Sequence, residues 1–140
     1  MVELLLLPAV YLGIIIGLYE IFAFQRDVQV PMHKFSHAAQ AFIFTIILTF
    51  ISMNIDWVLA TFPVLKTIPY IQNALILRII IGLIAVIKIH AISAAVSGKA
   101  GSSIGMKEKW SHSLIIGILI IGAPYAWPFI SPFIAKYLPV

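Results

Sequence analysis

Cysteine is absent from the 140 residues of this chain, and charged residues are scarce. The first absence excludes disulfide bonds and thiolate metal sites and leaves the redox compartment undetermined. Asp, Glu, Lys and Arg together make up 10% of the chain, against about 25% in an average soluble protein. The net charge of +4 comes from isolated residues at segment ends. This pattern indicates membrane topology signals rather than a nucleic-acid partner.

Familiar catalytic motifs are missing as well. Gly98-Lys99 lacks the spacing of a phosphate-binding loop. The chain contains no HExxH pattern of zinc proteases. Its one GxSxG match, Gly101-Ser102-Ser103-Ile104-Gly105, follows no predicted strand, whereas the serine-hydrolase motif stands on a strand-to-helix turn. No motif therefore proposes an enzyme, and we expect no cofactor.

Apolar residues dominate what is present. Hydrophobic residues make up 62% of the chain, and the mean hydropathy is +1.09. A soluble fold of this length cannot bury so much apolar surface, so we predict a single all-α membrane domain over residues 1–140 whose solvent is the lipid bilayer. The predicted fold is a bundle of four transmembrane helices. Their approximate ranges are Leu4–Phe24, Ser36–Trp57, Tyr70–Ile89 and Ser111–Ile130.

An internal repeat organises these segments. Lys34-Phe35-Ser36-His37 returns as Lys109-Trp110-Ser111-His112, in both places just before a long apolar run. Upstream, Ile14-Ile15-Ile16-Gly17-Leu18 returns as Ile79-Ile80-Ile81-Gly82-Leu83. Repeats of this kind are a primary clue to architecture. A third match, in the same order, pairs Trp57, Lys66 and Pro69 with Trp127, Lys136 and Pro139.

The repeat predicts two parallel helical hairpins, unit A over about residues 4–70 and unit B over about residues 71–140. Halves of this kind are related by an axis along the membrane normal. The repeat also decides between two ranges for the third segment. It favours Tyr70–Ile89 over Ala74–Val96, so that Ala91–Gly105 becomes a flexible or re-entrant connection.

Basic residues predict the orientation. The connections near residues 25–34 and 91–109 carry more Lys and Arg than the opposite side, which places both connections in the cytoplasm and both termini outside the cell membrane. The basic residues of the two connections are Arg26, Lys34, Lys99, Lys107 and Lys109, whereas the other side has Lys66 and Lys136.

Three ionisable residues are candidates for a polar path through the membrane. Arg78 falls near mid-depth of the third segment, Glu20 lies within the first, and Asp56 ends the second. Charged groups inside a bilayer are costly and usually face the protein interior. The structural alternatives are a pair between Arg78 and Asp56 or Asn54, and a Glu20 that is solvated at the interface or paired with Lys88.

His37 and His112 are candidates for metal or haem ligands. They occupy equivalent positions in the repeat, and bundle cores can build such sites from facing helices. The alternative is that both are interfacial histidines at helix ends.

Gly13 and Gly17 form a GxxxG pattern, which favours close helix packing in lipid. Few buried ionisable groups, short loops and faces of small residues favour a non-catalytic scaffold or accessory subunit in a homo- or hetero-oligomeric membrane complex. The second hypothesis is a small transporter or an ion or proton channel that uses Arg78 and Glu20. A third is a bis-His haem or metal protein.

Overall fold

The computed structural model describes residues 3–27, 34–99 and 109–137 of the chain. Within these ranges all regular secondary structure is helical, which confirms the all-α prediction for this part of the protein. The elements are α1 (Leu6–Asp27), α2 (Lys34–Met53), α3 (Ile55–Thr61), the 3-10 helix η2 (Pro63–Thr67), α4 (Ala74–Lys99) and α5 (Trp110–Ile134).

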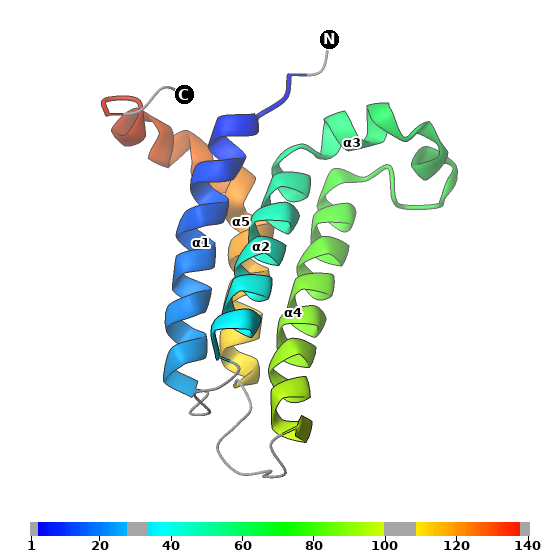
Figure 1. Ribbon diagram of the computed structural model, residues 1–140. Helices are drawn as coiled ribbons and strands as arrows, with labels where there is room; N and C mark the ends of the chain where they lie inside the picture. Colours follow the sequence, from blue (N-terminus) through cyan, green and yellow to red (C-terminus); the bar gives the residue numbers. More distant parts are fainter. Residues whose placement is uncertain (1–2, 28–33, 100–108, 138–140) are drawn as a thin grey trace.

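Three helices, α1, α4 and α5, are long and apolar enough to cross a membrane. A fourth span arises if α2 and α3 count as one, although they are bent by 81° relative to each other. Figure 1 shows α1, α2, α4 and α5 side by side, with α3 lying across the end at which α1 begins and α5 ends. The long apolar helices are compatible with a membrane protein.

Glycine permits the close contact between α1 and α2. A Cβ atom added at Gly13 would lie 3.0 Å from the Cα atom of Ile46, and one added at Gly17 would lie 2.5 Å from a ring carbon of Phe42. Without a side chain, each glycine lets the facing helix approach its backbone. The helix-packing role predicted for this GxxxG pattern is therefore confirmed.

Glycine also permits the contact between α4 and α5. A Cβ atom at Gly82 would lie 3.1 Å from the Gly117 carbonyl oxygen, and one at Gly117 would lie 3.0 Å from the Gly82 carbonyl oxygen. Side-chain atoms lie closer still, because Ile121 Cδ1 would be 2.5 Å from a Cβ at Gly82 and Val86 Cγ2 would be 2.5 Å from a Cβ at Gly117. The neighbouring side chains and the facing backbone would therefore have to shift to admit a side chain at either position.

The predicted range of the third segment, Tyr70–Ile89, is wrong. Helix α4 begins at Ala74 because the Asn73 side chain caps it: Asn73 Oδ1 accepts hydrogen bonds from the backbone N–H groups of Leu75 (2.9 Å) and Ile76 (3.3 Å). These groups have no partner inside the helix, so a side-chain acceptor fixes the start. The helix continues to Lys99. Residues 91–99 are thus helical, and the rest of the predicted connection lies outside the described residues.

The second predicted segment also ends too late. Helix α2 stops at Met53, and Trp57 lies in α3, where its ring packs edge-on against Phe50 with centroids 6.2 Å apart. The surface segment expected after Trp57 contains the end of α3 and the short helix η2. The chain then turns at Tyr70, which has a φ of 69°.

Candidate functional site

Arg78 lies one turn after the start of α4, beside the end of α2, and not near mid-depth as the shorter helix range had predicted. Its Nε–H donates to the Ser52 carbonyl oxygen at 3.2 Å, and its Nη1 donates to the Tyr125 hydroxyl at 3.2 Å. The guanidinium carbon also lies 5.2 Å from the centroid of the Tyr125 ring. Arg78 therefore joins α4 to both α2 and α5.

The Ser52 carbonyl is available because α2 ends there. The last four carbonyl groups of a helix have no intrahelical donor, and the 81° bend to α3 prevents the chain from supplying one by continuing straight. A cation at this position also complements the negative end of the helix dipole. The Arg78 guanidinium thus caps the C-terminal end of α2.

The Ser52 hydroxyl makes a second interhelical bond. It donates to the Ile120 carbonyl oxygen at 2.8 Å, and Ser52 is completely buried. In a regular helix that carbonyl would accept from the residue four positions later, which here is Pro124. Proline has no backbone N–H, so the Ser52 hydroxyl replaces the donor that Pro124 lacks.

Asn54 fastens the start of α1 to the bend between α2 and α3. Its Oδ1 accepts from Leu5 N–H at 2.7 Å, and its Nδ2 donates to the carbonyl oxygens of Leu5 (3.3 Å) and Phe50 (2.9 Å). The side chain is 3% exposed. We refer to Ser52, Asn54, Arg78 and Tyr125 together as the polar junction.

The predicted pair of Arg78 with Asp56 or Asn54 is wrong. Arg78 is bonded to Ser52 and Tyr125, and Asn54 directs its side chain to the backbones of α1 and α2. Asp56 is exposed in the first turn of α3, where a carboxylate is favourable at the positive end of the helix.

Glu20 lies on α1, far along the helix from the polar junction, and is completely buried. The solvated position proposed as its structural alternative is therefore not observed. Lys88, the partner considered for Glu20 in the second structural alternative, is exposed on α4. The role of Glu20 in a polar path through the membrane stays a prediction.

Buried hydroxyl groups occupy the region between Glu20 and Arg78. Thr45, Thr49 and Ser52 follow one another along one face of α2, and Ser113 lies on α5; all four are completely buried. Thr45 donates to the carbonyl oxygen of Ala41 at 2.8 Å within its own helix. Thr49 Oγ1 and Ser113 Oγ have no hydrogen-bond partner within the described ranges.

The histidine hypothesis stays untested. His112 is half-buried in the first turn of α5, whereas the side chain of His37 lies outside the described residues. His90 stacks on Trp110 with ring centroids 3.7 Å apart. Across the described part of the chain, no group of three or more His, Cys, Asp or Glu residues could hold a metal ion.

Sequence reasoning missed the roles of Ser52, Tyr125 and Asn73. Asn73 was recognisable as an asparagine directly before an apolar helical run. Pro124 signalled a free carbonyl at Ile120, but the sequence does not show which helix supplies the donor.

The described residues define a class: an all-helical protein whose long apolar helices are compatible with a membrane location. No protein-family model, curated protein or solved structure matches the chain.

Proposed function

We propose that this protein is a small four-span membrane scaffold, an accessory subunit of an oligomeric membrane complex. One observation carries the proposal: Arg78, the cation that a transport path would use, bonds residues of two other helices. Its guanidinium bonds the α2 carbonyl of Ser52 and the α5 hydroxyl of Tyr125. A charge used in this way stabilises the helix arrangement and adds no chemistry.

The glycine contacts support the proposed duplication. The first match aligns Gly17 with Gly82, and the Lys-aromatic-Ser-His match aligns Phe42 with Gly117. Gly17 meets Phe42 in the first hairpin, and Gly82 meets Gly117 in the second. The contact between Gly17 and Phe42 is thus equivalent to the contact between Gly82 and Gly117 under two independent sequence matches. A chance resemblance gives no reason to expect this agreement.

Burial along the second helix of each hairpin supports the same alignment. Four buried positions in the first part of α2 coincide with buried positions of α5 when His37 is aligned with His112. The aligned pairs are Ala38 with Ser113, Ala41 with Ile116, Thr45 with Ile120, and Leu48 with Ala123. Further along α2, the buried residues Thr49, Ser52 and Met53 align with residues that are not buried.

The outer face of α5 supports assembly with another subunit. A Cβ atom added at Gly122 meets nothing within 4 Å, and Ala126 follows one turn later. A small residue at each of two such positions allows a second helix to approach closely in lipid. The α4 and α5 spans are each 28% buried, against 44% for the α1 span, so the small residues, and not the burial, distinguish α5 from α4.

Photo-crosslinking tests the proposed assembly. A photoreactive amino acid is placed at position 122 of the full chain and, as the control, at Ile87, which is 60% exposed on α4. In native membranes we expect position 122 to give a discrete adduct with a membrane protein, identified by mass spectrometry, while position 87 gives lipid adducts. Lipid adducts alone from both positions would reject the assembly.

One observation favours a transporter or channel as the second candidate. The buried hydroxyls of Thr45, Thr49 and Ser113 lie between Glu20 and Arg78 and provide polar atoms inside an apolar bundle. Proton or cation flux into proteoliposomes tests this candidate. Flux that disappears in Glu20→Gln, while Asp56→Asn keeps it, would favour transport over the scaffold.

A further inference from the structure

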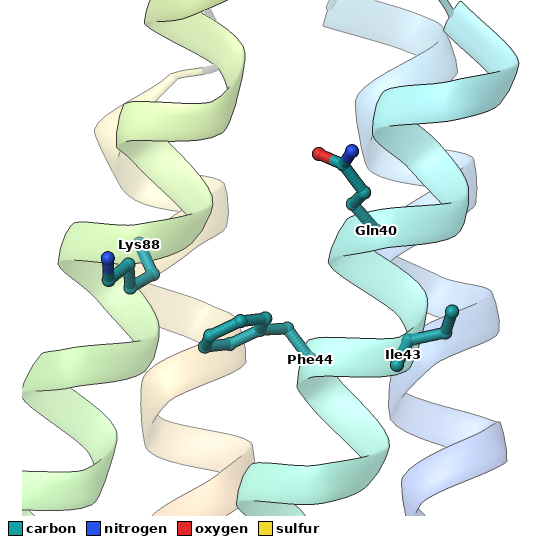
Figure 2. A pocket seen from close by; sticks show the side chains of 4 residues that line it. All are labelled: Gln40, Ile43, Phe44 and Lys88. Atoms are coloured by element: carbon teal, nitrogen blue, oxygen red, sulfur yellow. The ribbon is translucent and has the colours of Figure 1, made fainter.

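We propose that the cavity between α2 and α4 binds an anionic phospholipid of the surrounding bilayer. The cavity has a volume of about 320 Å³ and is lined by Gln40, Ile43, Phe44 and Lys88. Figure 2 shows Phe44 extending from α2 toward α4, with the Gln40 amide and Lys88 on the two helices beside it. Gln40, Ile43 and Lys88 are exposed, so the cavity opens to the outside of the bundle.

The lining residues match the two parts of a phospholipid. Lys88 provides a cation and Gln40 an amide donor, and these suit a phosphate group. Ile43 and Phe44 provide an apolar wall for an acyl chain. Among the described residues, no carboxylate lines the cavity, so no negative charge there would repel an anion. Basic pockets between transmembrane helices bind anionic headgroups in this way.

The position of Lys88 along α4 fits a headgroup contact. With a rise of about 1.5 Å per residue, Lys88 lies about 21 Å from Ala74, where the apolar span begins. It is then about 9 Å short of the far edge of a hydrocarbon core about 30 Å thick. A lysine stem covers much of that distance by extending toward the headgroups. A phosphate beside it would compensate a charge that is otherwise costly among lipid tails.

The polar residues Lys88 and Gln40 distinguish this cavity from the equivalent interface of the other hairpin. This comparison rests on the proposed duplication. The equivalent interface lies between α5 and α1, which are in contact. Lys88 corresponds there to Ala23 of α1. The α2 residues of the cavity correspond to Ile115, Ile118 and Leu119. Of these two interfaces, as far as the described residues show them, the one between α2 and α4 is therefore the one that combines an apolar wall with a cation and an amide.

Native mass spectrometry of the full chain tests the proposal. The protein is purified with equal amounts of phosphatidylglycerol, which is anionic, and phosphatidylcholine, which is zwitterionic, with identical acyl chains. We expect the wild type to retain the anionic lipid about fivefold better, the preference that one lysine near a headgroup supplies. Lys88→Ala should abolish the preference, and Lys88→Arg should keep it. Phe44→Ala should lower retention of both lipids and leave their ratio unchanged.

Lys66→Ala is the matched control, because Lys66 is also exposed but lies in η2 at the other end of the bundle. It should retain the wild-type preference. Equal retention of both lipids by the wild type would overturn the proposal, and so would an equal loss in Lys66→Ala and Lys88→Ala. Circular dichroism verifies that each variant is folded, and Lys88→Gln replaces Lys88→Ala if the alanine variant is not. Neither result depends on whether a partner subunit binds at Gly122.

Discussion

Replacing Ser52 by alanine tests the bond between α2 and the proline-containing helix α5. The change removes the hydroxyl that donates to the Ile120 carbonyl at 2.8 Å. Because Pro124 supplies no N–H to that carbonyl, the oxygen would be left without its only interhelical donor at a completely buried position. Interhelical hydrogen bonds in membranes are worth about 0.6 kcal/mol on average, with a maximum of about 1.7. An unsatisfied buried acceptor raises the expected loss to about 1–3 kcal/mol.

The assay is reversible unfolding in mixed micelles, followed by circular dichroism. Thr45→Ala is the matched control, because Thr45 is equally buried on the same helix but donates to Ala41 in its own helix. Its loss removes no interhelical bond, so we expect a smaller effect than that of Ser52→Ala.

A double-mutant cycle makes the reasoning refutable. Pro124→Ala restores the backbone N–H that the Ile120 carbonyl accepts in a regular helix. Ser52→Ala should therefore cost less in the Pro124→Ala background than in the wild type, with a coupling of at least about 0.5 kcal/mol. Strictly additive effects would show that the serine hydroxyl does not replace the missing proline donor.

Three further predictions follow from the helix contacts and the charge distribution. Gly117→Ala should destabilise the protein by about 1–3 kcal/mol in the same assay, because its Cβ would meet the Val86 side chain and the Gly82 carbonyl oxygen. Gly122→Ala, with open space around it, should change stability by less than about 0.5 kcal/mol; equal effects would contradict this packing. Asn73→Ala should cost about 1 kcal/mol through loss of the α4 cap, whereas Asn73→Asp should keep most of the stability; an unchanged unfolding midpoint in the alanine variant would argue against the cap. In intact cells, an impermeant thiol reagent should label Thr67→Cys but not Ser102→Cys, as the basic connections predict; the reverse pattern would invert the orientation.

Local sequence was enough to predict the protein class, the approximate positions of the helices and one of their contacts. Long apolar runs with few charges define helices that suit lipid. A helix satisfies its backbone hydrogen bonds within one segment, so this property can be read from each segment alone. Gly13 and Gly17 predicted close packing for the same reason: the absence of a side chain is a property of the residue itself. Asn73 also marks the start of α4 locally, whereas the internal repeat predicts a start four residues too early.

The tertiary structure alone decided the partners of the polar side chains. The sequence placed Asp56 and Asn54 at the correct end of the bundle for Arg78, yet the guanidinium bonds Ser52 and Tyr125. A hydrogen bond depends on which free donors and acceptors the packed helices bring within about 3 Å. The bend after Met53 exposes one carbonyl and Pro124 leaves another without its donor. Arg78 reaches the first carbonyl and the Ser52 hydroxyl reaches the second. These contacts depend on how the helices are rotated and how they cross, and no single segment specifies that geometry.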